Sequence, residues 1–152
     1  MRVLFDTSVL VAALVEAHPN HGLAFPWLEA ALSEGPVTGL VATHGLAETW
    51  AVLTRLPLVT PLAPMVAHQI VERLARALVV LPADPDLYLA SIERCGLQGL
   101  RSGAVFDALH LLTAERAEAS ALVTFNAQDF RRLATPESCG IQVPGSDPPP
   151  AG

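Results

Sequence analysis

The sequence predicts an α/β fold with a mostly parallel sheet and helices on both of its faces. Short apolar runs, typical of buried strands, alternate with longer segments in which apolar residues recur at helical spacing. Parallel strands need crossover connections, so this alternation predicts helices packed on both faces of one sheet. The chain has 152 residues, of which 51% are hydrophobic and 16% are charged. This length and composition suit one domain with one core.

The first third of the chain is predicted to form two strands and three helices. The apolar run at 3–5 is a short buried strand, and the side chains of residues 6–8 offer oxygens that cap the helix after it. A second helical stripe, interrupted by Pro26, ends at Gly35 and Pro36. In chain order we expect a strand at 3–5, helices at 9–16 and 21–32, a strand at 37–41 and a helix at 43–55.

The remainder continues the alternation. Prolines between residues 57 and 64 mark a connection, and Pro85 falls in the first turn of a later helix. Prolines concentrate again in residues 144–152, which predicts a disordered tail after a domain that spans residues 1–143. In chain order we expect a helix at 65–78, a strand at 79–81, helices at 84–95 and 102–119, a strand at 121–124, a short helix at 130–133 and an edge strand at 141–143.

The charge of the chain limits how it could bind nucleic acid. With a net charge of −6 and an isoelectric point of about 5.2, it lacks the basic field that holds polynucleotides by charge alone. Any contact with nucleic acid must therefore be local, assisted by a metal ion, or made within an assembly.

The cysteines and the apolar segments indicate the cellular setting. Cys95 and Cys139 form no CxxC motif and have no matching histidine pattern, so we expect reduced thiols and a cytoplasmic protein. Asp6 interrupts the apolar N-terminal segment, which argues against a signal peptide. No stretch reaches the roughly 18 uninterrupted apolar residues of a membrane span.

Three carboxylates, Asp6, Glu48 and Asp107, each lie where an apolar run gives way to a helix. Carboxylates that are distant in sequence but placed alike suggest one site for a hard cation. Asp6 and Asn126 also follow strands, at the sheet edge where parallel sheets bind ligands. An isolated Asp before a helix is more often a cap, and Glu48 alone could be a solvated helix residue. Their co-occurrence with Thr124-Phe-Asn126 favours the site.

Four segments together resemble the motifs of the PIN-domain ribonucleases, and more narrowly those of the VapC-type toxins of bacterial toxin–antitoxin modules. The segments are Asp6-Thr7-Ser8 after the first strand, Glu48, Asp107-Ala-Leu-His-Leu-Leu-Thr-Ala114, and Thr124-Phe-Asn126-Ala-Gln-Asp129-Phe130. Each motif alone is weak, but the ordered set is specific, and the resemblance covers about residues 1–143.

The resemblance implies an acidic pocket that holds Mg²⁺ or Mn²⁺. Asp6 and Asp107 match the principal metal ligands, and Glu48 matches the acid that completes the cluster, as a further ligand or as a general base. Asn126 stands where many members have an acid, and Asp129 follows three residues later. We assign both to positioning water at the metal. A neutral amide lowers the charge of the site without removing an oxygen ligand, so one ion and two ions both stay open.

Other side chains are expected to support this cluster. Thr7, Ser8 and Thr124 would hold the Asp6 carboxylate. His110 is expected in the core or behind the ligands, since no other histidine stands at ligand spacing from it. Because clustered carboxylates repel, one of them should be protonated more readily than an isolated acid when metal is absent.

The resemblance further implies a metal-dependent endoribonuclease toxin that hydrolyses phosphodiester bonds in structured RNA. It implies a homodimer, no membrane association, and a small cognate antitoxin. A basic antitoxin residue, expected to be Arg, would pair with the acidic pocket. Apolar residues of the helices at 21–32 and 65–78, including Trp27, would form the walls of an antitoxin groove.

Two other kinds of protein share some of these features. A phosphoacceptor receiver domain needs an acidic pair and a lysine, whereas Asp6 has no acidic neighbour and the chain contains no lysine. A catalytically degenerate PIN-fold interaction protein stays open, because Asn126 departs from the family pattern. Arg131 and Arg132 could contact RNA phosphate or simply form a solvated face.

Overall fold

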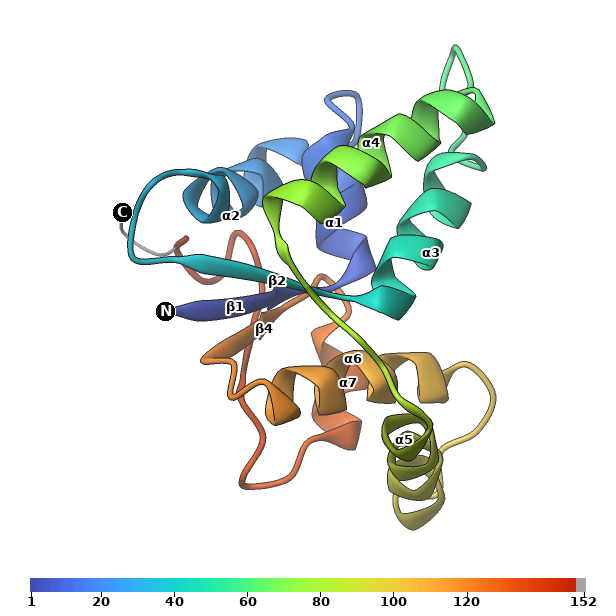
Figure 1. The fold of residues 1–152 in the computed structure, drawn as a ribbon, viewed down its shortest axis with the longest axis vertical. Coiled ribbons are helices and arrows are strands. Elements are labelled where there is room, and N and C mark those ends of the chain that lie inside the picture. The colour runs from blue at the N-terminus through green and yellow to red at the C-terminus, as the bar shows by residue number, and fades with distance from the viewer. Residues whose placement is uncertain (150–152) are drawn as a thin grey trace.

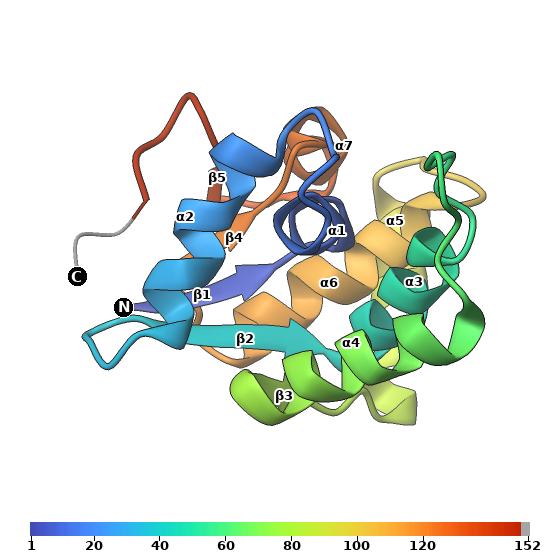
Figure 2. The same ribbon diagram turned by 90° about the horizontal axis from the view of Figure 1, so that it is seen from above.

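The computed structural model describes residues 1–149 (Figure 1). Its five strands pair in the order β3-β2-β1-β4-β5, every pair parallel, and Figure 2 shows β1 between β2 and β4. The predicted fold class is therefore confirmed. The strands are β1 (Arg2–Phe5), β2 (Thr38–Ala42), β3 (Val79–Leu81), β4 (Ala121–Val123) and β5 (Gly140–Gln142).

The helices follow the predicted sequence of elements. None of those described in residues 1–149 is both long and apolar enough to cross a membrane. The helices are α1 (Thr7–Leu14), α2 (His21–Leu32), α3 (Thr43–Leu53), α4 (Pro64–Ala77), α5 (Pro85–Leu97), α6 (Ala104–Arg116) and α7 (Ala127–Leu133).

The alternation of side chains along β1 divides the core into two layers. Val3 and Phe5 pack in one cluster with Trp27 of α2, whereas Leu4 packs in a second cluster with Phe130 of α7. Helices α1, α2 and α4 accordingly cover one face of the sheet, and α6 and α7 cover the other, with α5 packed on α6 (Figure 1). β1 is thus buried from both sides and forms a fixed base for the residues that follow it.

Several predicted boundaries were wrong for identifiable reasons. The first helix begins at Thr7 rather than residue 9, because Asp6 itself is its N-cap. The predicted helix over 102–119 is shorter at both ends, since Ser102 and Glu118 adopt φ values of 55° and 51°, which a helix does not allow. The last helix begins at Ala127 rather than residue 130.

The C-terminal segment begins with a turn. The Val143 N–H donates to Asp147 Oδ2 at 2.7 Å, and Pro144 and Asp147 form an isolated bridge. The structure thus describes residues 144–149 of the segment predicted to be a disordered tail. Residues 150–152 lie outside the described residues.

The site is positioned where the chain changes direction across the sheet. After β1 the chain crosses to β2 on one side, and β4 occupies the other side of β1. Ligands of parallel sheets bind at the carboxyl ends of the strands at such a switch point. The register pairs Phe5 with Val123, so Asp6 and Thr124 leave the sheet next to each other.

Gly39 on β2 provides a test of how closely α2 packs on the sheet. A Cβ at this position would lie 2.6 Å from Leu78 Cδ2 and 2.9 Å from Ala31 Cβ, which is closer than carbon atoms pack. We expect Gly39→Ala to lower the free energy of unfolding in urea by about 1–3 kcal/mol. Gly22→Ala on α2 is the matched control, because no atom lies within 4 Å of its added Cβ. It should be neutral or stabilising, and equal losses from both variants would contradict this packing.

Candidate metal-dependent active site

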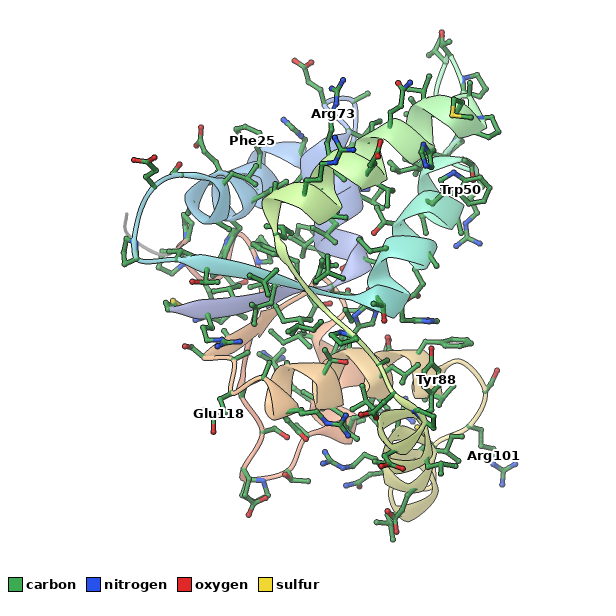
Figure 3. The ribbon with its side chains drawn as sticks, viewed as in Figure 1. Phe25, Trp50, Arg73, Tyr88, Arg101 and Glu118 are labelled. Carbon is green, nitrogen blue, oxygen red and sulfur yellow. The ribbon has the colours of Figure 1, made fainter. Side chains whose placement is uncertain are left out.

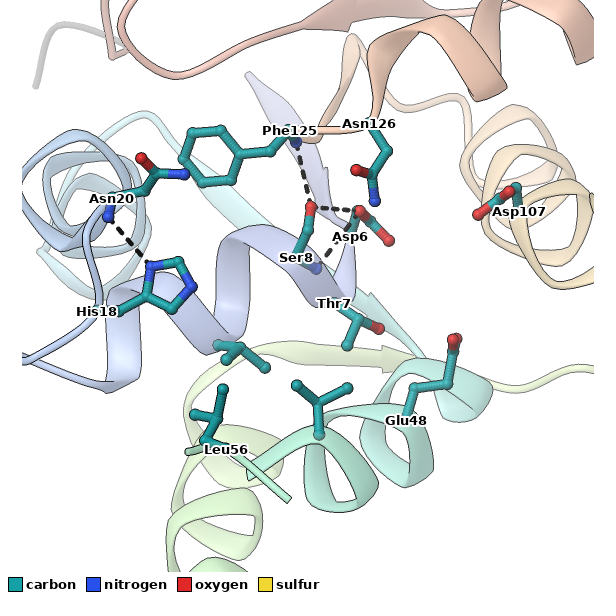
Figure 4. A pocket seen from close by; sticks show the side chains of 12 residues that line it. Asp6, Thr7, Ser8, His18, Asn20, Glu48, Leu56, Asp107, Phe125 and Asn126 are labelled. Atoms are coloured by element: carbon teal, nitrogen blue, oxygen red, sulfur yellow. Dashed lines mark hydrogen bonds between the residues drawn. The ribbon is translucent and has the colours of Figure 1, made fainter. Parts of the chain in front are cut away.

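One cavity lies at the carboxyl ends of β1 and β4 (Figure 4). It has a volume of about 390 Å³. Asp6, Glu48, Asp107 and Asn126 all line it, although they come from four separate segments of the chain. The structure therefore brings together four of the five residues that the sequence singled out. Asp129 does not line this cavity.

Asp6 is held in one orientation by its neighbours. Its side chain is buried, and its Oδ2 accepts hydrogen bonds from Ser8 Oγ at 2.6 Å and from Thr124 Oγ1 at 2.8 Å. Oδ1 accepts none from the residues that the structure describes, so it is the oxygen available to a ligand. The predicted roles of Ser8 and Thr124 agree with these contacts, but the one predicted for Thr7 does not. Thr7 Oγ1 is buried and, within residues 1–149, has no hydrogen-bond partner.

The same two hydroxyl groups fasten the segment after β4. Ser8 Oγ accepts the Phe125 N–H at 3.1 Å, and Thr124 Oγ1 accepts the Asn126 N–H at 2.9 Å. Each hydroxyl thus donates to Asp6 and accepts from this segment, as a hydroxyl group can. The backbone that carries Asn126 is consequently fixed relative to the Asp6 carboxylate.

Glu48 on α3 is oriented by a buried histidine on α6. His110 is 1% exposed, and its Nε2 lies 2.7 Å from Glu48 Oε1. Gly45 permits this approach, since a Cβ there would lie 3.0 Å from His110 Cε1. His44 Nε2 lies 3.2 Å from the same Glu48 oxygen. With Oε1 engaged by the histidines, Oε2 is the oxygen of Glu48 that can act in the cavity.

The histidines also set the charge of Glu48. Burial by itself would raise the pKa of Glu48, but the hydrogen bond and charge of His110 outweigh it and hold that pKa below its ordinary value. Burial lowers the pKa of His44, whereas the acids around His110 overcome its burial and raise the pKa of His110. These surroundings therefore favour the ionised form of Glu48, the neutral form of His44 and the protonated form of His110.

Asp107 has the opposite electrostatic character. Burial, together with the charges of Asp6 and Asp129, raises its pKa to about 6. The expected repulsion among the carboxylates thus falls mainly on Asp107. A cation in the cavity would relieve that repulsion, so the electrostatics favour cation binding.

The donor set fits a cation that keeps part of its water shell. Among residues 1–149, no three His, Cys, Asp or Glu side chains stand close enough to enclose an ion directly. Mg²⁺ in proteins commonly uses one or two carboxylates and completes its octahedron with water and phosphate oxygens. Asp6 Oδ1 and the Asp107 carboxylate are suitable for that purpose, and Asn126 adds a neutral oxygen.

Asp129 lies in a separate hollow that adjoins the cavity. This hollow shares Asp107 with the main cavity and is also lined by Arg101 and Arg132. Arg132 Nη1 is 4.0 Å from Asp129 Oδ1. The helix that carries Asp129 begins at Ala127, so the residue lies one turn beyond Asn126 and faces the other side of Asp107.

Sequence reasoning missed the contribution of His44. It lies one helical turn before Glu48 on α3, and the ring of Phe106 stacks on it with ring centroids 5.0 Å apart. The spacing of four residues from Glu48 was a visible signal for the contact.

The two tryptophans differ from each other: Trp27 is 1% exposed, whereas Trp50 is 40% exposed and donates through Nε1 to Pro64 O at 3.1 Å (Figure 3).

The raised pKa of Asp107 predicts a pH-dependent effect on stability. Above about pH 6 the charged Asp107 carboxylate lowers the free energy of unfolding. Below about pH 4 this effect is absent, because the carboxyl group is protonated in both the folded and the unfolded protein. In metal-free buffer Asp107→Asn should therefore raise the free energy of unfolding by about 1–3 kcal/mol near pH 8 and leave it unchanged below about pH 4. Glu93→Gln, on the exposed surface of α5, is the control and should have no effect. A stabilisation that persists at low pH would rule out this electrostatic origin.

Comparison with known proteins identifies relatives along nearly the whole chain. The family model of the PIN domain matches residues 3–136. Ribonuclease VapC27 of Mycobacterium tuberculosis is 36% identical over 139 residues, which are 91% of this chain and 92% of that protein. Ribonuclease VapC40 of the same organism is 33% identical over 138 residues, 91% of this chain and 94% of the relative.

Solved structures share the fold at lower sequence identity. VapC20 of Mycobacterium tuberculosis, a toxin that cleaves the sarcin–ricin loop, has a TM-score of 0.67 and 20% identity, and the match covers 84% of this chain and 92% of that one. VapBC2 of Rickettsia felis, bound to a DNA fragment of its promoter, has a TM-score of 0.66 and 19% identity, with coverage of 94% and 98%. By its family model and its VapC27 and VapC40 relatives, the chain belongs to the PIN-domain family and, within it, to the VapC ribonucleases.

Proposed function

We propose that this chain is a Mg²⁺-dependent endoribonuclease, the toxin of a toxin–antitoxin module, and that it hydrolyses phosphodiester bonds in structured RNA. The observation that carries the proposal is the convergence of Asp6, Glu48 and Asp107 on one cavity at the β1–β4 switch point. The relatives VapC27 and VapC40, both named ribonucleases, support the reaction type. Mn²⁺ has the same preference for carboxylate, carbonyl and water ligands and should substitute.

The proposed chemistry assigns a separate task to each side chain. Asp6 and Asp107 would hold Mg²⁺, which would supply neutralisation of charge on the scissile phosphate and a lower pKa for the attacking water. Asp6 presents Oδ1 in a fixed direction, because Ser8 and Thr124 hold Oδ2. Glu48 Oε2 accepts the proton of the attacking water or serves as a further ligand. The Asn126 amide orients that water.

The neighbouring hollow suits the continuation of the RNA backbone. Asp129 stands there with Arg101 and Arg132, next to Asp107. We assign Asp129 to positioning water on this side of Asp107, and Arg132 to a flanking phosphate. Because the chain as a whole carries a net charge of −6, contact with RNA is confined to such local sites. Single-stranded regions of a structured RNA meet this requirement better than a regular duplex does.

A small antitoxin is the proposed protein partner, bound to a homodimer of this chain. A groove of about 270 Å³ between α2 and α4 is lined by apolar residues that include Leu28, Leu32 and Ile70, and an amphipathic helix could lie in it. Trp27 was wrongly expected among its walls, since it is 1% exposed and packs inside the core. An antitoxin segment with an Arg would pair with the carboxylates of the main cavity. A cytoplasmic location agrees with this setting and with the free Cys95 and Cys139.

Removal of a proposed metal ligand tests the enzyme assignment. We expect Asp6→Asn or Asp107→Asn to reduce Mg²⁺-dependent RNA cleavage by purified protein about a thousandfold, because each change removes charge that binds the ion. Glu48→Gln should be similarly damaging. Glu93→Gln is the charge-matched control and should retain wild-type cleavage.

The same variants identify the substrate. Sequencing of RNA 5′ ends after brief induction of the wild type, compared with Asp6→Asn, should give one or a few dominant cuts in a structured RNA. Dispersed cuts across most messages would overturn the substrate assignment alone. Cleavage that is equal in wild type and Asp6→Asn, in preparations free of other nucleases, would overturn the enzyme assignment.

Asn126→Asp tests whether this side chain contributes to the metal site. An added carboxylate in the cavity should tighten Mn²⁺ binding by about three- to tenfold in a calorimetric titration. Gln128→Glu adds the same charge to the exposed surface of α7 and serves as the control. Equal affinities for wild type and Asn126→Asp would place Asn126 outside the coordination of the ion.

A further inference from the structure

The main cavity has two ends of different chemistry. The carboxylates of Asp6, Glu48 and Asp107 face one end, and the opposite end is formed by His18, Asn20 and Phe125 (Figure 4). The floor between them includes apolar residues such as Leu56. No acidic residue among those described lines the His18 end. This end therefore suits a neutral group rather than a cation or a phosphate.

The turn between α1 and α2 fixes the direction in which His18 can donate. The Asn20 N–H donates to His18 Nδ1 at 3.1 Å. Since Nδ1 accepts this hydrogen bond, the neutral imidazole carries its proton on Nε2. Nε2 has no hydrogen-bond partner among residues 1–149, so the ring offers a donor to whatever occupies the cavity.

Asn20 offers a second unpaired polar group at the same place. It is the N-cap residue of α2, but its side chain makes no capping hydrogen bond, and it forms none with the rest of the described chain. A side-chain amide presents both a donor and an acceptor. The Asn20 amide can thus read the edge of a planar polar group that also accepts from His18.

Phe125 completes this end of the cavity with an aromatic ring. Its backbone N–H donates to Ser8 Oγ at 3.1 Å, which fixes the backbone from which the ring extends toward Asn20 (Figure 4). Aromatic side chains next to unpaired hydrogen-bonding groups are the usual means by which proteins bind single-stranded bases.

We infer that the His18, Asn20 and Phe125 end of the cavity binds an unpaired nucleobase of the RNA next to the cleaved phosphodiester bond, and so selects the cleavage site. The inference rests on the proposed ribonuclease function. The base stacks on Phe125, accepts a hydrogen bond from His18 Nε2, and pairs its edge with the Asn20 amide. Because both ends belong to one cavity, a nucleoside attached to the phosphate at Asp6 reaches this end without leaving it.

The test uses RNA hairpins with a fully randomised single-stranded loop, cleaved by the whole protein in Mn²⁺, with sequencing of the cut ends. Wild type should prefer one base at one position beside the cut. His18→Ala and Asn20→Ala should each reduce that discrimination about tenfold, as expected for one lost hydrogen bond to a base, and leave other positions unchanged. Phe125→Leu should raise KM about tenfold with little change in kcat, because stacking is lost while the apolar volume is kept.

Two further variants separate base recognition from the structure of the turn. In His18→Asn the amide oxygen can still accept the Asn20 N–H, but the donor at the place of Nε2 is gone, so this variant should behave like His18→Ala. His68→Ala, on the exposed surface of α4 away from the cavity, should behave like wild type.

The outcomes show whether the inference fails alone or together with the proposed ribonuclease function. Cleavage with unchanged base preference in His18→Ala and Asn20→Ala overturns the inference and leaves the ribonuclease standing. Wild-type preference in His18→Asn together with its loss in His18→Ala assigns the effect to the turn and also overturns it. A wild-type protein that shows no base preference at any position also overturns the inference. No cleavage by wild type in Mn²⁺ overturns both.

Discussion

The parallel pairing of β1 with β4 is the constraint on which the site depends. The pair ends with Phe5 opposite Val123, and the Asp6 N–H continues it by donating to Val123 O at 3.0 Å. Thr124 Oγ1 then donates to Asp6 Oδ2, so the backbone ladder passes into a side-chain hydrogen bond. Because the side chains of β1 are packed on both faces, Asp6 could not shift without disturbing two core clusters. The position of the first carboxylate is therefore a property of the sheet.

The fold places two acids in one cavity and treats their charges in opposite ways. Glu48 has its negative charge stabilised inside the protein, by His110 behind it, whereas Asp107 has its charge opposed by burial and by Asp6. Environments that separate the pKa values of neighbouring acids commonly separate their roles. An added cation would stabilise the charge of Asp107 most, whereas the charge of Glu48 is already stabilised by His110. This difference is consistent with a ligand role for Asp107 and a proton-accepting role for Glu48.

Local patterns in the sequence were enough to predict the parallel fold and four residues of the cavity, since strand ends and helix starts are local features. Local patterns did not give the way in which helices approach one another or the exact residues at which they begin. The contact of Glu48 with His110 requires α3 to approach α6 at Gly45, which no local pattern records. Asp129 was grouped with Asn126 because they are near in sequence, yet the early start of α7 turns it to the far side of Asp107.

The two ends of the cavity are built from parts of the fold that differ in how freely they can change. The carboxylate end depends on β1, α3 and α6, whose side chains are locked in the core or in the Glu48–His110 pair. His18 and Asn20 instead lie on the turn between α1 and α2, where a substitution disturbs neither the sheet nor the core. In the function we propose, rigid elements carry the chemistry of the cut, and the choice of the neighbouring base depends on this turn together with Phe125 after β4. If this inference holds, changes at His18 and Asn20 should alter which RNA is cut while the hydrolytic site stays intact.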